Sequence, residues 1–200
     1  MNINRLFSEF ERLKVLVVGD IMLDAYFYGS VNRISPEAPV PIVNLNGKER
    51  RLGGAANVAL NLKSLGAEPI VCSIKGNDRD GDQLKELFAM HDLSTLGLIN
   101  DYNRATTVKT RIIGNNHQLL RIDEEETTPI NPSLEDLVYN AVNSFIKEVD
   151  VLVFQDYNKG LLTPSLIRRI IDLAQQNEVP TVVDPKFNNF FEYQGVTMFK

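Results

Sequence analysis

Two adjacent glycines, Gly53 and Gly54, stand directly before an apolar helical pattern that carries Asn57 in its first turn. The first N–H groups of a helix have no partner within the helix and lie at the positive end of its dipole. Glycines let a ligand approach these amides, and Asn57 offers both a donor and an acceptor. A charged, proline-rich stretch at residues 33–41 precedes this turn. The combination predicts a site for a polyhydroxylated, anionic small molecule. A glycine turn needed only for packing is the alternative.

Asp24 follows the apolar run at residues 15–18, after Gly19 and Asp20. Ligands of open α/β sheets bind beyond the carboxyl ends of the strands, so Asp24 is placed to accept hydrogen bonds from ligand hydroxyls. One charge-assisted bond of this kind contributes about 1.5–3 kcal/mol. An aspartate that only caps a turn is an equally weighted alternative.

Basic side chains gather between residues 104 and 122. Lys109 and Arg111 share one face of a predicted strand, with Arg104 before it and Arg121 after it. As a group they could grip a phosphate ester in a chain whose net charge is negative. Taken singly, each is by default a solvated surface charge.

Two further pairs of an acid and a lysine follow predicted strands. Asp156 and Lys159 come after the apolar run at 151–154, and Asp184 and Lys186 come after that at 181–183. Both pairs lie where a ligand site is expected, and Lys186 could neutralise the charge of nucleotide phosphates. For Asp184, which precedes a proline, a simple turn is the alternative.

Alternating strand and helix patterns must position these residues. Strands are predicted at 14–20, 70–74, 151–154, 181–183 and 196–200, the first two of them buried. Helices are predicted at 53–65, from a capping box at Asp80 and Gln83, from Asn131 and from Thr163. Such alternation favours an α/β fold with a parallel sheet covered on both sides.

Two regions do not follow this succession of strands and helices, and within them polar and apolar residues alternate. The segment 25–28 with 40–45, and 106–113 with 117–122, read as half-exposed antiparallel strands. We predict that they form a small β-sheet lid, made of segments 25–45 and 104–122, on a single domain that covers residues 1–200.

Composition narrows the class of protein. The 200 residues are 44% hydrophobic and carry a net charge of -5, which argues against nucleic acid as a partner. The single cysteine fits a reducing compartment, and no apolar run is long enough for a membrane span. We therefore expect a cytoplasmic protein with no membrane or nucleic-acid partner.

Six motifs together resemble the ribokinase-like (PfkB) carbohydrate kinases, and most closely their branch that acts on D-glycero-β-D-manno-heptose 7-phosphate. They lie at residues 18–24, 33–41, 53–57, 116–123, 156–160 and 183–186. The resemblance implies a three-layer α/β/α sandwich with a β-sheet lid, ATP and Mg²⁺ as cofactors, and a homodimer formed through the lid. It implies transfer of the ATP γ-phosphoryl group to the anomeric hydroxyl of the heptose phosphate, in the synthesis of ADP-heptose for the lipopolysaccharide core.

The resemblance also implies roles for individual residues. Those expected to hold the sugar hydroxyls are Asp24, Gly53, Gly54 and Asn57. Candidates for the 7-phosphate, chosen on charge more than on motif, are Arg33, Lys109 and Arg121. Asp156 and Lys159 would border the sugar, and Asp184 and Lys186 would face the transferring phosphates and Mg²⁺.

The family's Asn-x-x-Glu element and its Gly-Ala-Gly-Asp segment, which holds the catalytic base, are not found up to Lys200. We therefore expect a ribokinase-like domain without its C-terminal part, nearly inactive by itself. Two alternatives remain: a non-catalytic module that binds sugar phosphates, and a lid-mediated dimerisation element. A nicotinamide-dependent oxidoreductase is disfavoured, because the first βα turn lacks the glycine pattern that cradles a pyrophosphate.

Overall fold

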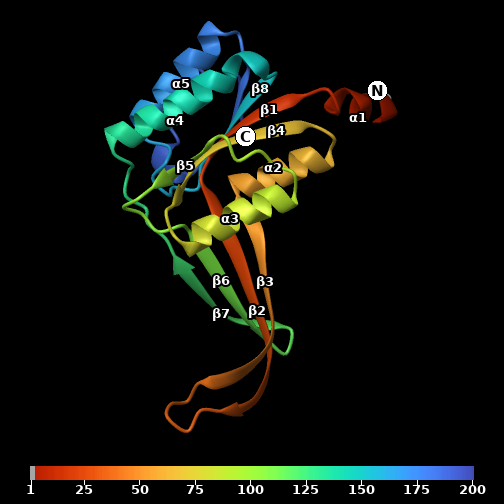
Figure 1. Ribbon diagram of the computed structural model, residues 1–200, viewed down its shortest axis with the longest axis vertical. Helices are drawn as coiled ribbons and strands as arrows, with labels where there is room; N and C mark the ends of the chain where they lie inside the picture. Colours follow the sequence, from red (N-terminus) through yellow and green to blue (C-terminus); the bar gives the residue numbers. More distant parts are fainter. Residues whose placement is uncertain (1–2) are drawn as a thin grey trace.

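The computed structural model describes residues 3–200 and centres on a six-stranded parallel sheet (Figure 1). The strand order is β10-β9-β8-β1-β4-β5. The strands are β1 (Lys14–Gly19), β4 (Glu68–Gly76), β5 (Leu98–Asp101), β8 (Val151–Gln155), β9 (Thr181–Asp184) and β10 (Met198–Phe199). The predicted parallel sheet is thus confirmed, with β5 as a strand that the sequence did not reveal.

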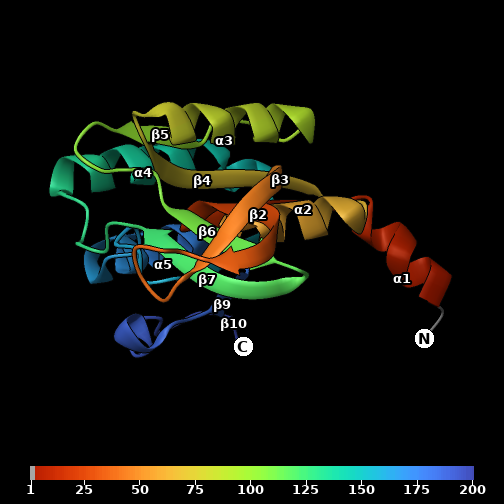
Figure 2. The same ribbon diagram turned by 90° about the horizontal axis from the view of Figure 1, so that it is seen from below.

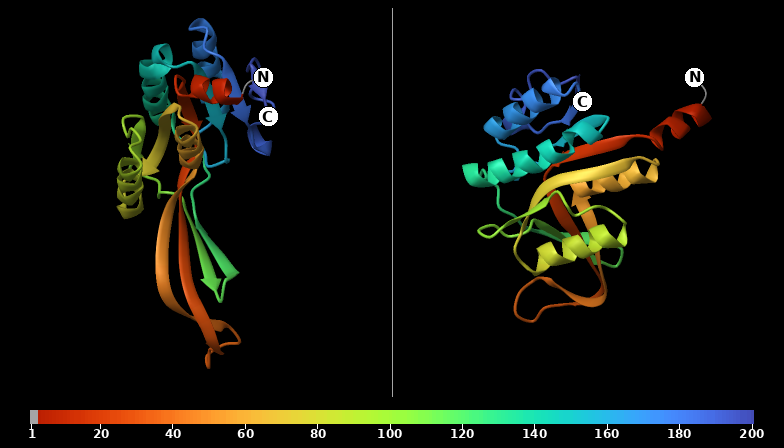
Figure 3. Two further views of the ribbon diagram at one scale, coloured as in Figure 1. Left: turned by 90° about the vertical axis from the view of Figure 1, so that its right-hand side faces the viewer. Right: turned by 45° about the horizontal axis from the view of Figure 1, so that its top comes forward.

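Helices cover both faces of this sheet. Helices α2 (Ala55–Ser64) and α3 (Arg79–Met90) pack on one face, and α4 (Pro132–Phe145) and α5 (Pro164–Gln176) on the other (Figures 1 and 3). Strand β1 is buried on both sides because its side chains alternate: Leu16 and Val18 enter one core, Val15 and Val17 the other. Helix α1 (Ile3–Phe10) precedes β1, and short 3₁₀ turns lie at Ile146–Glu148 and Phe187–Asn189.

Helix starts follow capping chemistry. The side chain of Asn131 accepts from the Leu134 amide, and that of Thr163 accepts from the Leu166 amide, each with a proline next in the chain. Helix α3 begins two residues earlier than predicted. Its cap is Asp78, which accepts from the Gly81 amide at 2.7 Å, so the capping box expected at Asp80 is wrong.

A second sheet of four strands projects from the carboxyl edge of the first (Figures 1 and 3). Its order is β3-β2-β6-β7, with β2 (Ile21–Ile34), β3 (Pro41–Gly54), β6 (Val108–Gly114) and β7 (His117–Glu124). We call this sheet the lid. Figure 2 looks up at it from below, with its strands in front of the central sheet.

Two details of the predicted lid pairing are wrong. Ala25 pairs with Arg50, not with the 40–45 segment, because β3 runs on without a break to the glycine pair. Strands β2 and β6 are parallel, whereas the lid was expected to be antiparallel throughout. The β6–β7 turn is as predicted: Asn115 and Asn116 both have positive φ, which a two-residue hairpin turn requires.

The lid has one apolar and one polar face near its base. Leu23, Ala25, Leu52 and Val108 join the core beneath α2 and α3. Asp24, Arg51 and Lys109 point to the opposite face, since neighbouring residues of a strand alternate. None of the helices within residues 3–200 combines the length and the apolar character needed to cross a membrane.

Candidate functional site

The Asp24 carboxylate lies against the backbone of Gly53. A Cβ atom on Gly53 would stand 2.5 Å from Asp24 Oδ2, so a larger residue there would displace the carboxylate. The other oxygen, Oδ1, accepts from Arg111 Nη1 at 2.6 Å, and both side chains are about four-fifths buried. Oδ2 accepts no hydrogen bond from residues 3–200, so it is available to a ligand hydroxyl.

Gly54 makes the turn from β3 into α2. Its φ of 59° lies in the left-handed region, and a Cβ there would stand 2.3 Å from the carbonyl oxygen of Asp20. That carbonyl accepts from the Ala55 amide at 2.9 Å. Asn57 is exposed in the first turn of α2, and its side chain makes no hydrogen bond within residues 3–200. The predicted glycine turn is therefore a neighbour of Asp24 at the base of the lid, and Asn57 follows it in the first turn of α2.

Lys109 lies beside Asp24 on the adjoining strand, in register. Its ammonium contacts Asp123 at 3.0 Å and Glu125 at 2.9 Å. Desolvation opposes the charge, but the hydrogen bonds to Glu125 and Asp123 outweigh it and raise the pKa of Lys109. The predicted cation is therefore at the site, already paired with carboxylates.

The other two predicted phosphate contacts are farther out. Arg121 pairs with Asp123 at 2.9 Å and is half exposed. Arg33 is exposed near the end of β2, nine residues beyond Asp24, which corresponds to about 30 Å along a strand. The structure thus brings Asp24 and Lys109 together but does not bring Arg33 to them within one chain.

Asp156 is 1% exposed, and protein groups surround both of its oxygens. Oδ1 accepts from the Asn158 amide at 2.8 Å, and Oδ2 accepts from Asn189 Nδ2 at 2.9 Å and the Tyr193 hydroxyl at 2.8 Å. Desolvation, followed by the charge of Asp156, raises the pKa of Tyr193. These contacts give Asp156 a structural environment, although the sequence suggested that it borders the sugar.

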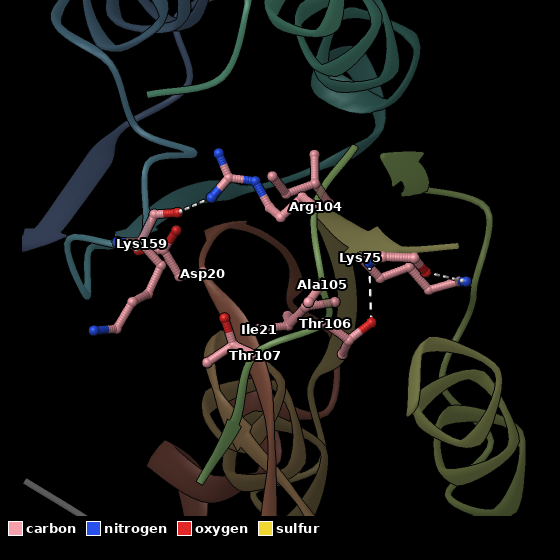
Figure 4. A pocket seen from close by; sticks show the side chains of 10 residues that line it. Asp20, Ile21, Lys75, Arg104, Ala105, Thr106, Thr107 and Lys159 are labelled. Atoms are coloured by element: carbon pink, nitrogen blue, oxygen red, sulfur yellow. Dashed lines mark hydrogen bonds between the residues drawn. The ribbon is translucent and has the colours of Figure 1, made fainter. Parts of the chain in front are cut away.

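The loop between β8 and α5, residues 156–160, is fastened from two sides (Figure 4). Asp20 Oδ2 accepts from the Tyr157 amide at 2.8 Å and the Lys159 amide at 3.2 Å. Arg104 donates to the Lys159 carbonyl at 3.1 Å and to the carbonyls of Glu126 and Thr128. Lys159 is therefore carried by a fixed backbone, and its ammonium reaches Glu125 at 2.8 Å.

Asp20 is 4% exposed, and its titration should be unusual. Burial raises the pKa of this carboxyl to about 6, from an ordinary value of 3.8, although backbone amides of the loop donate to it. Its carbonyl holds the start of α2 and its carboxylate holds the β8–α5 loop. Asp20 thus links the start of α2 to the β8–α5 loop, which are the two parts of the candidate site.

We expect Asp20→Asn to change the pH dependence of stability. Between pH 3.8 and about 6 the folded state binds more protons at this group than the unfolded state does. The free energy of unfolding of the unsubstituted chain should therefore fall, relative to the variant, by about 3 kcal/mol as the pH rises through that window. Urea unfolding of both chains at a series of pH values measures the difference. A difference that stays constant with pH would contradict the assignment.

Asp184 and Lys186 lie at the carboxyl end of β9. Asp184 Oδ2 contacts Lys200 Nζ at 3.0 Å, and the Lys186 ammonium lies 5.5 Å from the centre of the Tyr157 ring. Lys186 is exposed and thus open to an anion. Among residues 3–200, no group of three or more His, Cys, Asp or Glu side chains gathers closely enough to hold an ion. We assign no step to a metal.

Sequence reasoning missed three residues of this region. Asp20 and Glu125 were passed over, and Arg104 was grouped with the phosphate-gripping cations although it holds three backbone carbonyls. For Asp20 a signal existed, since an acid directly after a buried strand lies at the carboxyl edge. For Glu125 and Arg104, partners such as Lys159 lie on loops whose course no local pattern reveals.

Comparison with known proteins identifies close relatives by sequence. The chain is 40% identical over 197 residues to the bifunctional protein HldE of Geobacter sulfurreducens, and 38% identical over 185 residues to that of Helicobacter pylori. These matches cover 98% and 92% of this chain but 40% of each relative. The chain thus spans about 40% of the length of the curated relatives that it matches.

Two solved structures with the same fold are a phosphofructokinase and a ribokinase by title. Phosphofructokinase-2 from Escherichia coli, in its tetrameric inhibited form, superposes with a TM-score of 0.65 at 14% identity, over 90% of this chain and 57% of that one. Arabidopsis thaliana ribokinase complexed with ribose and ATP gives 0.60 at 13% identity, over 86% and 53%. The fold is therefore ribokinase-like.

A family model agrees with both comparisons. The model described as pfkB family carbohydrate kinase matches residues 12–195, which include the Asp24 carboxylate, the glycine turn and the lid. The chain belongs to the pfkB family of carbohydrate kinases.

Proposed function

We propose that this chain provides the sugar site of an ATP-dependent kinase for D-glycero-D-manno-heptose 7-phosphate, in the synthesis of ADP-heptose. The observation that carries the proposal is that an available Asp24 oxygen, over Gly53, lies at the same edge of the central sheet as two lysines, Lys109 and Lys159. A carboxylate suits sugar hydroxyls, and ammonium groups suit a phosphate. The similarity to proteins named HldE supports the heptose as the sugar.

Residues of different charge would bind different parts of the two substrates. Asp24 would accept hydrogen bonds from sugar hydroxyls, the α2 amides and Asn57 would bind others, and the lid would keep water away from the transfer. Lys186, exposed at the carboxyl end of β9, would face the phosphates of ATP. We assign no catalytic base within residues 3–200, because Asp20 and Asp156 are hydrogen-bonded to protein groups on a buried loop. The base would come from elsewhere in the kinase.

We also propose that the lid forms a homodimer. Strand β7 is exposed along its whole length at one edge of the lid, and its apolar side chains include Leu120 and Ile122, which are 55% and 46% exposed. An exposed edge strand with apolar residues tends to pair with another chain. Sedimentation velocity across a concentration series should show a dimer. A monomer at all concentrations would contradict this proposal alone.

Calorimetric titration of the 200-residue chain with heptose 7-phosphate tests the proposed function. We expect saturable binding, and weaker binding of the same heptose without its phosphate. Circular dichroism establishes that the chain is folded under the same conditions. A folded chain that binds neither sugar would overturn the proposal.

A further inference from the structure

Glu125, just past the end of β7, lies between two lysines. Its Oε2 is 2.9 Å from Lys109 Nζ, and its Oε1 is 2.8 Å from Lys159 Nζ. The lysine side chains are each 16% exposed and the Glu125 side chain is 22% exposed, although its main chain follows the exposed edge of the lid. Desolvation opposes ionisation, but the two lysines outweigh it and lower the pKa of Glu125. One carboxylate thus bridges two ammonium groups, with one oxygen for each.

The two lysines come from different parts of the fold. Lys109 belongs to β6 of the lid, whereas Lys159 belongs to the β8–α5 loop of the main body. The main chain of Lys159 is held on both sides, by Asp20 at its amide and by Arg104 at its carbonyl (Figure 4). Arg104 also holds the carbonyl of Glu126, directly after Glu125. The main chain of Lys159 is therefore held by contacts that do not involve the Glu125 side chain, and the Lys109 ammonium keeps Asp123 as a second partner.

This pair of lysines borders the candidate sugar site. Lys109 and Asp24 are in register on adjacent parallel strands, so their side chains leave the same face of the lid at a spacing of about 4.8 Å. Asp123 is the second partner of Lys109, but it is also held by Arg121 at 2.9 Å. Glu125 is the carboxylate that contacts both lysines, so a ligand that binds both ammonium groups would take its place.

We propose that Lys109 and Lys159 form the binding site for the phosphate group of the sugar, and that Glu125 occupies this site until the ligand displaces it. This inference rests on the proposed function. A phosphate dianion offers one oxygen to each lysine, as the carboxylate does, and carries more charge. The displaced side chain lies at an exposed edge of the lid and can turn to water.

Displacement of Glu125 by the ligand would also make the site specific for phosphorylated sugars. A sugar without a phosphate cannot replace Glu125 at the lysines, so it gains only the contacts at Asp24 and the glycine turn. Glu125 would thus disfavour other anions that bind less strongly than a phosphate anchored by its sugar. A side chain that already occupies the site competes with every anion, which is one way in which proteins discriminate against the wrong ligands.

The test is Glu125→Gln, with Glu124→Gln as the matched control on the neighbouring residue. Each chain is titrated with heptose 7-phosphate, with the unphosphorylated heptose, and with inorganic phosphate. For Glu125→Gln we expect about tenfold tighter binding of the heptose phosphate and tighter binding of inorganic phosphate. Binding of the unphosphorylated heptose should not change, and Glu124→Gln should match the unsubstituted chain. Lys159→Met should remove most of the preference for the phosphorylated sugar.

The two failures are distinguishable. If Glu125→Gln binds heptose phosphate and inorganic phosphate no more tightly than the unsubstituted chain, or more weakly, Glu125 holds the lysines in place and the exchange is refuted. If neither sugar binds to any chain but Glu125→Gln still gains affinity for inorganic phosphate, the exchange stands and the proposed sugar-kinase function fails.

Discussion

Asp24→Asn should weaken the binding of heptose 7-phosphate by about 10- to 100-fold while the chain stays folded. The substitution keeps the shape of the side chain but removes the charge, and a charge-assisted hydrogen bond is worth about 1.5–3 kcal/mol. The oxygen expected to bind the sugar, Oδ2, is the one that lies over Gly53 and accepts no hydrogen bond within residues 3–200. Calorimetric titration gives the affinity, and thermal unfolding gives the stability.

Glu49→Gln is the matched control for this prediction. It also changes a lid carboxylate that pairs with an arginine, Arg51 at 2.6 Å, but that pair is largely exposed. Exposed ion pairs contribute little, so neither stability nor sugar affinity should change measurably. Equal loss of affinity in both variants would mean that the lid's general charge, not the Asp24 oxygen, holds the ligand.

Asp156→Ala should lower the free energy of unfolding by about 3–6 kcal/mol, the largest stability effect that we expect. The substitution leaves three donors without their acceptor: the Asn158 amide, the Asn189 side chain and the Tyr193 hydroxyl. Each buried unsatisfied group costs about 1–3 kcal/mol. Urea unfolding measures the loss, and sugar affinity should be retained in the fraction that remains folded.

An exposed aspartate on the same half of the molecule provides the comparison. Asp172 lies on the solvent side of α5, and Asp172→Ala should change stability by no more than about 0.5 kcal/mol. The opposite pattern for Asp156, normal stability with lost sugar affinity, would restore the role that the sequence suggested for it at the border of the sugar.

Much of the fold could be predicted because its signals are local. The apolar run of β1, the prolines after Asn131 and Thr163, and the asparagines of the β6–β7 turn each specify an element through a few adjacent residues. The lid pairing could not be predicted in the same way. The partners of β2 are chosen by the length of β3 and by a long excursion of the chain before β6, and neither is encoded beside β2.

The candidate site was predictable in residue type but not in environment. Asp24 and the glycine pair were chosen as candidates because ligands of open α/β sheets bind beyond the carboxyl ends of the strands. Charge alone could not separate Lys109 and Lys159, which face each other across Glu125, from Arg104, which holds backbone carbonyls. The difference lies in contacts between residues 16 to 55 positions apart.

The continuity of β2 has a mechanical consequence. One uninterrupted strand starts among core residues at Ile21 and ends at the far tip of the lid at Ile34. Its pairing with β3 shifts register at Tyr28/Gly29 and at Val31/Arg33. The root of the lid, with Asp24, is therefore built on the core, and the hydrogen-bond ladder of its outer half is interrupted at these irregularities. We expect the lid to bend along its outer half and not to rotate about a hinge at its base.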